Sequence, residues 1–319
     1  MRSWTATGAR LARSLALLLC LLPAAMPAAA GEPIRAVATF SILGDLVRQV
    51  GGATVTVTDL VGPDADAHGY SPAPGDSRTL AAADIVFVNG LGFEGWMDRL
   101  ILASGAKAPV VIASRGVTTI PAHHAHAGED SRGGVGNHAA EGSTVDPHAW
   151  QSLANAEVYV ANIRDGLSKA DPTNAAAYGR NAEGYLATLD TFATEVRATL
   201  ATIPPEHRRV ITTHDAFGYF SAAYGLAFLA PQGVSTESEA SPQDVARIIR
   251  QIRRDKVPAV FIETIADPRL MQQIARESGA RIGGKVYSDA LSGPDGPAST
   301  YLDMMRNNLR AFGAALAPR

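Results

Sequence analysis

Short apolar runs alternate with longer amphipathic stretches along most of the chain. From residue 35 the runs RAVATF, TVTVTDLV, DIVFVNG and PVVIAS are separated by SILGDLVRQV, GDSRTLAAA and GFEGWMDRLILA. After residue 204 the alternation returns, with RRVITT, LAFLAP, PAVFIET and RIGGKVYS separated by DAFGYFSAAYG, SPQDVARIIRQIRRD and DPRLMQQIARESG. Strands that alternate with helices of about ten residues are typical of parallel sheets covered by helices. The pattern predicts two α/β lobes, each with a mainly parallel sheet flanked by helices.

A helical pattern fills the middle of the chain. Residues 152–203 favour helix except at ADPTN, where Asp171 can cap one helix and Pro172 can open the next. The second helix is predicted over 172–203 and is about 45 Å long at 1.5 Å per residue, which exceeds one small lobe. We therefore expect a single rigid helix between the lobes. The two lobes show no convincing internal sequence repeat.

The first thirty residues have the features of a secretory signal peptide. Three arginines precede an apolar run over 15–22, and MPAAA ends at Ala30. The only cysteine, Cys20, could carry a lipid anchor, but the bulky Leu19 before it argues against lipoprotein processing. No later apolar run reaches the roughly 18 residues needed to span a bilayer. We expect a periplasmic protein, released by cleavage after Ala30 and without a lipid anchor.

These boundaries divide the chain into four parts. They are a signal peptide over 1–30, an N-terminal lobe over 31–171 with a His-rich loop at 121–142, a linking helix over 172–203, and a C-terminal lobe over 204–319.

Composition narrows the kinds of partner and of metal site. Without the leader the chain has 25 basic and 31 acidic side chains, a net charge of −6, which argues against nucleic acid as a partner. The mature chain has no cysteine, which excludes a disulfide framework and a thiolate metal site. Any metal site must be built from imidazole and carboxylate groups.

Four residues follow strand ends, where an open parallel sheet binds its ligand. His68 lies in the loop after TVTVTDLV, His214 follows RRVITT, and Asp289 follows GKVYS. His148 lies in VDPHAW, in the segment that returns from the first lobe. Each alone is more readily explained as a surface or capping residue. Three imidazoles and one carboxylate, two from each lobe, make an N3O set suited to Zn²⁺, so together they predict a metal site between the lobes.

Carboxylates close to these residues could orient the histidine rings. Asp66, Asp146 and Asp215 each lie within two residues of a predicted ligand and could accept a hydrogen bond from the free ring nitrogen. Turn or capping roles explain them equally well. Glu263, at a strand end of the second lobe, is expected to approach the site without ligating the metal.

Four further histidines, His123, His124, His126 and His138, lie in the His-rich loop. They are surrounded by Ala, Gly, Ser, Glu and Asp, which offer too little apolar surface to offset the entropy of ordering the segment. Their spacing suits weak, adaptable coordination, so they could collect metal for the main site. The alternative is a flexible insertion with no necessary function.

Several motifs resemble a known family. DAHGYSP at His68, DPHAW at His148, THDAFGYF at His214 and VYSDAL at Asp289 occur in the order found in zinc- or manganese-type substrate-binding proteins of ABC importers. PQGVSTESEASPQDVA and VFIETIADPRL resemble the second lobe of the zinc-binding members, and the similarity covers the whole mature chain. The resemblance implies two lobes joined by one rigid helix, metal ligation by these four residues, and docking on a membrane permease.

The resemblance also bears on the choice of metal. Manganese-type relatives typically have a carboxylate where this chain has His214, and three imidazoles favour the borderline-soft Zn²⁺. The expected function is therefore a high-affinity zinc receptor of an ABC importer that acts as a monomer. Its expected partners are the membrane permease and a periplasmic zinc donor protein. A manganese or mixed receptor is the alternative, because relatives with this ligand set are reported to accept either metal.

Two other functions are weighed against metal transport. A secreted zinc hydrolase would need an open coordination position, and the chain lacks HExxH, GxSxG and a Gly-rich phosphate loop. A hydrolase would be favoured again if Asp289 were not a ligand, because a water molecule could then take its place on the metal. A receptor for haem or an iron chelate would use basic or aromatic residues in the cleft, whereas Tyr70, Trp150 and Tyr219 are better explained as packing. We therefore expect a binding protein and not an enzyme.

Overall fold

The computed structural model describes residues 1, 32–122 and 145–317. The chain divides after Glu32 into two units, and the second, from Pro33 onward, is the one described below. The predicted signal peptide, the anchor position Cys20 and the histidines of the His-rich loop (His123, His124, His126 and His138) lie outside the described residues.

The N-terminal lobe contains a four-stranded parallel sheet in the order β2-β1-β3-β4. Its strands are β1 (Ile34–Phe40), β2 (Val55–Val61), β3 (Ile85–Val88) and β4 (Val110–Ile112). The helices between them are α1 (Ser41–Gly51), α2 (Pro74–Ala81) and α3 (Met97–Ser104). The alternation that the apolar pattern predicts is therefore present, and the strand order reverses between β1 and β3, which is where such sheets bind ligands.

The C-terminal lobe repeats this topology in the order β6-β5-β7-β8, again with parallel pairing. Its strands are β5 (Arg209–Ile211), β6 (Ala227–Leu229), β7 (Ala259–Glu263) and β8 (Arg281–Val286). Its helices are α6 (Gly218–Tyr224), α7 (Pro242–Asp255), α8 (Pro268–Ser278) and α9 (Tyr301–Leu316). The two lobes thus share one strand order without a visible sequence repeat.

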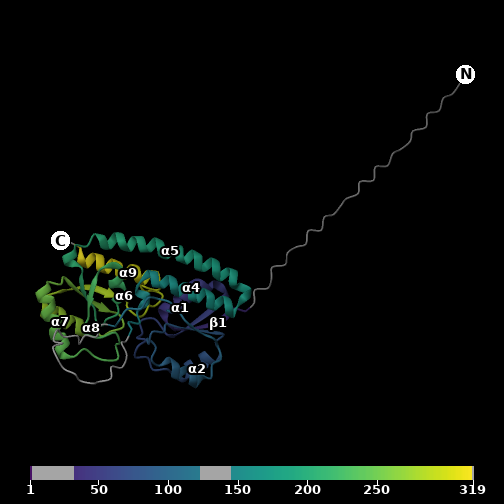
Figure 1. Ribbon diagram of the computed structural model, residues 1–319, viewed down its shortest axis with the longest axis horizontal. Helices are drawn as coiled ribbons and strands as arrows, with labels where there is room; N and C mark the ends of the chain where they lie inside the picture. The colour runs from purple at the N-terminus through teal and green to yellow at the C-terminus, as the bar shows by residue number, and fades with distance from the viewer. Residues whose placement is uncertain (2–31, 123–144, 318–319) are drawn as a thin grey trace. The chain divides into compact units, whose positions relative to one another are not determined.

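Two long helices, α4 (Leu153–Ala170) and α5 (Ala175–Ala201), fill the middle of the chain. The predicted break at ADPTN is a single 3₁₀ turn, over which the Asp171 carboxylate accepts hydrogen bonds from Asn174 Nδ2 (2.6 Å) and the Tyr178 hydroxyl (2.7 Å). α5 has 27 residues and so spans about 40 Å. It packs on α1 and α4 of the first lobe and on α9 of the second, and it crosses both lobes in Figure 1.

One apolar core extends through both lobes. It includes Val37 and Phe87 of the first sheet together with Phe217 and Phe312 of the second lobe, all at most 2% exposed. Trp150 is fully buried where the lobes meet, with its ring centroid 4.9 Å from that of Phe40. Because the lobes share a core, a wide hinge opening would expose apolar side chains to water.

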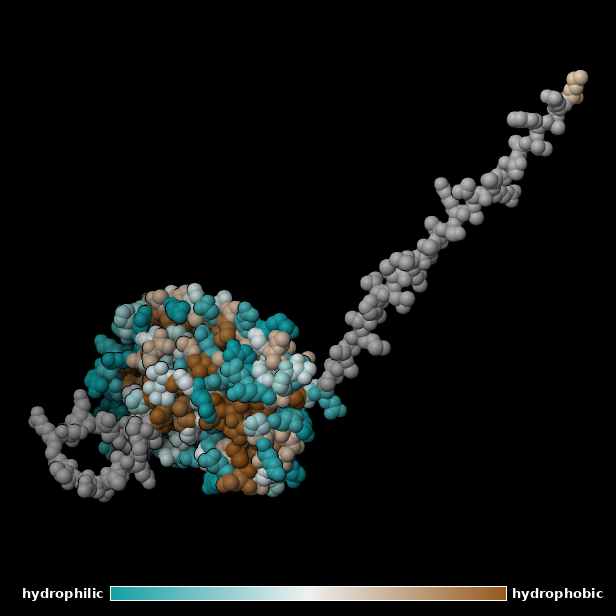
Figure 2. Space-filling model, turned by 45° about the vertical axis from the view of Figure 1, so that its right-hand side comes forward, coloured by the Kyte–Doolittle hydropathy of each residue, from teal (hydrophilic) through white to brown (hydrophobic). Residues whose placement is uncertain are grey.

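None of the helices in the described part of the chain is long and apolar enough to cross a bilayer. Figure 2 shows apolar residues gathered in the middle of one face of the molecule and toward its bottom, with hydrophilic residues around them.

Candidate metal centre

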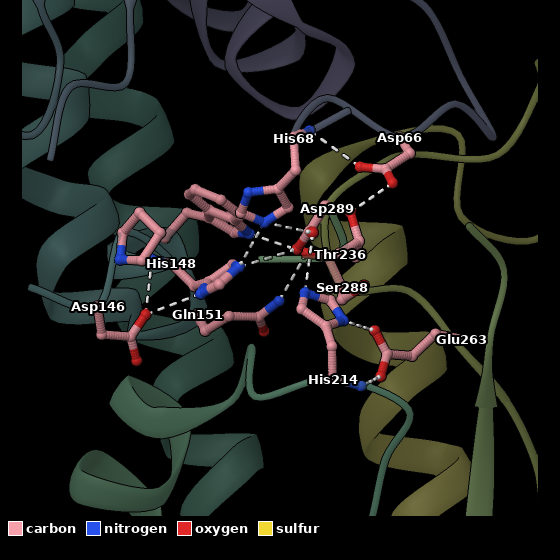
Figure 3. Close-up of polar contacts among 12 residues, drawn as sticks. Asp66, His68, Asp146, His148, Gln151, His214, Thr236, Glu263, Ser288 and Asp289 are labelled. Atoms are coloured by element: carbon pink, nitrogen blue, oxygen red, sulfur yellow. Dashed lines mark hydrogen bonds and ion pairs between the residues drawn. The ribbon is translucent and has the colours of Figure 1, made fainter. Parts of the chain in front are cut away.

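The four predicted ligands lie together beyond the carboxyl ends of the strands. His68 is in the loop after β2, His148 is in the segment that follows β4, and His214 and Asp289 follow β5 and β8 by three residues. One ligand atom from each lies within 4.8 Å of the other three. Figure 3 shows the four side chains pointing toward one another. His68 is 6% exposed and the other three are fully buried. The fold therefore brings the predicted set together, two residues from each lobe.

The distances between ligand atoms suit a small cation. His68 Nε2 lies 3.2 Å from His148 Nε2, and Asp289 Oδ2 lies 3.1 Å from His214 Nε2 and 3.3 Å from His68 Nε2. Asp289 Oδ1 lies 3.6 Å from His148 Nε2. A tetrahedral ion with bonds of 2.0–2.1 Å separates its ligands by about 3.3 Å, which is close to these values.

The Asp289 carboxylate is the feature that most calls for a cation. It is fully buried, and the polar groups that the described residues place against its oxygens are the imidazole Nε2 atoms of the three histidines. Burying a carboxylate is costly unless a positive charge compensates it. The three imidazole Nε2 atoms that surround it could share a divalent ion with it.

Two carboxylates orient the histidine rings. His148 Nδ1 lies 2.8 Å from Asp146 Oδ1, which also accepts the His148 backbone N–H at 2.9 Å. His214 Nδ1 lies 2.5 Å from Glu263 Oε2, while Glu263 Oε1 accepts the backbone N–H groups of Thr213 (2.6 Å) and His214 (2.9 Å). A carboxylate on Nδ1 fixes the ring orientation and leaves Nε2 to face the cluster.

The carboxylate of Asp66 contacts a backbone group and a residue of the other lobe in place of the predicted histidine ring. Asp66 Oδ1 accepts the backbone N–H of His68 at 2.9 Å, and Asp66 Oδ2 accepts the Thr236 hydroxyl of the other lobe at 2.5 Å. Asp66 therefore holds the loop and not the imidazole. Asp215 donates its backbone N–H to the Gly233 carbonyl at 3.1 Å, and the Nδ1 position expected for its carboxylate is taken by Glu263.

The histidines and carboxylates of the cluster shift one another's pKa values. Burial disfavours the charged form of His214, but the Glu263 and Asp289 carboxylates outweigh it and raise the pKa of His214 well above its usual value. Burial likewise opposes ionisation of Asp289, but the imidazoles of His214 and His148 lower its pKa well below the usual range. Burial lowers the pKa of His68.

The two ends of the undescribed 123–144 segment meet beside this site. Pro121 and Val145 form an isolated antiparallel bridge, and the Asp146 N–H donates to the Ile120 carbonyl at 3.0 Å. The Tyr219 hydroxyl accepts from the Ile120 N–H at 3.3 Å and donates to the Asp146 carbonyl at 2.9 Å. The predicted packing role of Tyr219 thus includes fixing the base of the loop.

Three polar residues near the site were not predicted from the sequence: Thr236, Gln151 and Ser288. Thr236 contacts Asp66 across the lobes, and Gln151 Nε2 donates to the Ser288 carbonyl at 2.8 Å. Their partners lie 137 or more positions away in the chain, so no local pattern could have revealed them. The one available signal was the position of Gln151 and Ser288 next to predicted site motifs.

Comparison with known proteins gives a consistent family. Residues 36–315 match the family described as the periplasmic component A of the zinc-uptake complex. The manganese-binding lipoprotein MntA of Halalkalibacterium halodurans is 33% identical over 90% of this chain and 90% of its own length. The iron-binding protein YfeA of Yersinia pestis is 32% identical over 88% and 85%.

A solved structure agrees with these sequence matches. The periplasmic zinc binding protein TroA from Treponema pallidum is similar with a TM-score of 0.80 and 30% identity, over 90% of this chain and 100% of that chain. The chain therefore belongs to the family of extracytoplasmic metal-binding proteins that serve as substrate-binding components of metal ABC importers with a membrane permease as partner, and it is not an enzyme.

Proposed function

We propose that this protein is a zinc receptor that binds one Zn²⁺ through His68, His148, His214 and Asp289 and presents it to the permease. The observation that carries the proposal is the fully buried Asp289 carboxylate, whose oxygens lie between 3.1 and 3.6 Å from three imidazole Nε2 atoms. Three imidazoles favour the borderline-soft Zn²⁺ over the oxygen-preferring Mn²⁺.

Manganese is the second candidate, and two observations favour it. MntA is named for manganese and YfeA for iron, so the metals for which similar proteins are named do not converge on zinc. Both Asp289 oxygens approach imidazoles, Oδ2 at 3.1 Å and Oδ1 at 3.6 Å, so the carboxylate could bind through both oxygens. Five donors with two oxygens would suit Mn²⁺ better than four donors do.

The test must compare metals as well as count sites, because Zn²⁺ outbinds Mn²⁺ at most nitrogen and oxygen sites. The protein would be stripped of metal and titrated with each ion against a competing chelator, as wild type and as His214→Glu and His214→Ala. We expect one tight Zn²⁺ site in the wild type. In His214→Glu, the ratio of Zn²⁺ affinity to Mn²⁺ affinity should be lower by roughly tenfold or more.

Two results would contradict the zinc assignment. One is wild-type protein that binds Mn²⁺ as tightly as Zn²⁺. The other is His214→Ala protein with unchanged Zn²⁺ affinity, which would show that His214 is not a ligand.

We propose an auxiliary role for His123, His124, His126 and His138, which would collect Zn²⁺ and pass it to the main site. The support is the attachment of both loop ends next to Asp146, whose carboxylate contacts His148. Deleting residues 123–138 should slow loading at low Zn²⁺ concentration and leave the equilibrium affinity unchanged. Loss of the tight site on deletion would mean that these histidines are ligands themselves.

The location and further partners are also proposals. We infer a periplasmic monomer that is cleaved after Ala30 and loaded by a zinc donor protein. MntA is named a lipoprotein, so acylation at Cys20 is the alternative. The mass of the mature protein distinguishes a free Gly31 N-terminus from a lipid-modified Cys20, and size-exclusion chromatography with light scattering tests the monomer.

A further inference from the structure

A short turn next to His148 contacts the residue before Asp289. The turn, Ala149–Gln151, is a 3₁₀ helix that follows His148 directly. Two of its side chains donate to a single acceptor, the Ser288 carbonyl: Trp150 Nε1 at 2.9 Å and Gln151 Nε2 at 2.8 Å. In Figure 3 the Gln151 amide lies below the ligand cluster and points toward Ser288. The peptide that carries Asp289 is thus bonded to the segment that carries His148.

This contact crosses between the lobes. Just before it, Tyr287 is bonded to α9 of its own lobe, with its N–H donating to Asn308 Oδ1 at 2.9 Å and its carbonyl accepting from Asn308 Nδ2 at 2.7 Å. At Ser288 the partners change to Trp150 and Gln151 of the first lobe. Both lone pairs of the carbonyl are used, so the plane of the peptide that leads to Asp289 is fixed relative to His148.

The geometry matters because the polar contacts of the Asp289 carboxylate are with the three histidines that would share the metal with it. The groups that hold Asp289 from outside the cluster are therefore those that bind its backbone. The bonds to Ser288 hold the peptide from which the Asp289 side chain extends, and Asp289 Oδ1 lies 3.6 Å from His148 Nε2. A ligand side chain that is already held in place loses less conformational entropy when the metal binds.

Gln151 is poorly explained as a residue that stabilises the fold. It is fully buried, and its Oε1 has no donor within the described ranges. A buried acceptor without a partner offsets much of what the amide gains through its other end. An apolar side chain of the same length would suit the core at least as well.

We propose that Gln151 is a positioning residue for metal binding, which with Trp150 holds Asp289 at coordination distance from His148 through the Ser288 carbonyl. This inference rests on the proposed function, because it assigns Asp289 to the metal. It predicts that removing the Gln151 donor weakens the bound metal without weakening the fold.

The test uses the full mature protein and Zn²⁺ alone. Gln151→Met keeps the length of the side chain and removes its donor. Roughly tenfold weaker Zn²⁺ binding is expected, mainly through faster dissociation, which is the range for partners that orient metal ligands. The melting temperature of the metal-free protein should stay the same or rise. Trp150→Phe removes the second donor and is expected to shift affinity in the same direction.

Asn155→Leu is the matched control. Asn155 Nδ2 donates to the carbonyl of Ala149 in the turn at 3.2 Å, and both residues belong to the first lobe. The variant therefore also removes an amide donor, but one whose hydrogen bond does not cross between the lobes. Its Zn²⁺ affinity should equal that of the wild type.

The outcomes separate this inference from the proposed function. Wild-type protein without a tight site would overturn the proposed function. Tight wild-type binding that Gln151→Met and Trp150→Phe leave unchanged in affinity and dissociation rate would overturn only the positioning role. If Gln151→Met lost Zn²⁺ affinity and its metal-free form also melted at a lower temperature than the wild type, the positioning role would likewise be overturned. Such a result would indicate that Gln151 stabilises the fold.

Discussion

At the scale of single residues, two buried carboxylates hold the histidines of the proposed metal site. Glu263 is fully buried and contacts His214 twice, at the ring through Oε2 and at the backbone through Oε1. Asp146 contacts His148 in the same two ways through one oxygen. Each lobe therefore holds one histidine through both its ring and its backbone. These two rings are already oriented for metal binding.

The Glu263→Gln variant tests this role and its pH dependence. Because Glu263 and Asp289 raise the pKa of His214, metal-free protein at pH 7 holds a proton there that Zn²⁺ must displace. Affinity should therefore rise with pH until the pKa of His214 is passed. In Glu263→Gln that pKa falls, so calorimetry in buffers of different ionisation enthalpy should show fewer protons released at pH 7. Affinity at high pH should fall roughly tenfold or more, because the ring loses its orienting partner.

The exposed Glu237 of the same lobe provides the control, since Glu237→Gln removes an equal charge away from the ring. Proton release that is equal in wild type and Glu263→Gln would show that His214 is not the protonated group.

At the scale of elements, the start of α6 packs against the site of the other lobe. A Cβ on Gly218, the first residue of α6, would clash with Asp146 Oδ2 and lie 3.0 Å from Ile120 Cδ1. The glycine therefore allows α6, which begins four residues after His214, to approach the carboxylate that orients His148. One short segment connects the orientation of two ligands from different lobes.

Gly218→Ala should displace Asp146 and weaken Zn²⁺ binding, with chelator competition as the measurement. The comparison variant is Gly184→Ala in α5, where an added Cβ meets nothing within 4 Å. It should raise the free energy of unfolding by about 0.5–1 kcal/mol, because alanine loses less entropy than glycine in a helix. Its Zn²⁺ affinity should not change. Normal metal binding by Gly218→Ala would show that Asp146 tolerates the shift.

At the scale of the whole molecule, the lobes are joined by more than a linker. α5 packs on helices of both lobes, and the apolar core is continuous from Val37 to Phe312. Asp66 and Thr236 add a hydrogen bond across the lobes beside His68. These contacts indicate that loading and release involve local movement of the ligand loops.

Small-angle X-ray scattering of metal-free and Zn²⁺-loaded protein tests this view. We expect a radius of gyration of about 19 Å for a compact chain of this length, and nearly the same value in both states. A clear expansion on removal of the metal would indicate a hinge between the lobes and contradict the shared core as the restraint.

The sequence by itself determined the features that depend on local order. The period of apolar residues predicted the alternating strands and helices, and ADPTN predicted the break before α5 because proline and a capping aspartate act on their immediate neighbours. The four residues now gathered in the site could be named because strand ends and flanking motifs are local as well. The domain boundaries at residues 171 and 203 remain predictions.

Only the tertiary structure decided which groups support those four residues. Asp215 is adjacent to His214 in sequence, yet the ring is held by Glu263 from the neighbouring strand β7, 49 residues from His214. Gln151 and Ser288 lie 137 positions apart, and Asp66 and Thr236 lie 170 apart. The physical reason is that a periodic pattern reports the face a residue occupies, whereas its partner across the cleft depends on how the two lobes pack.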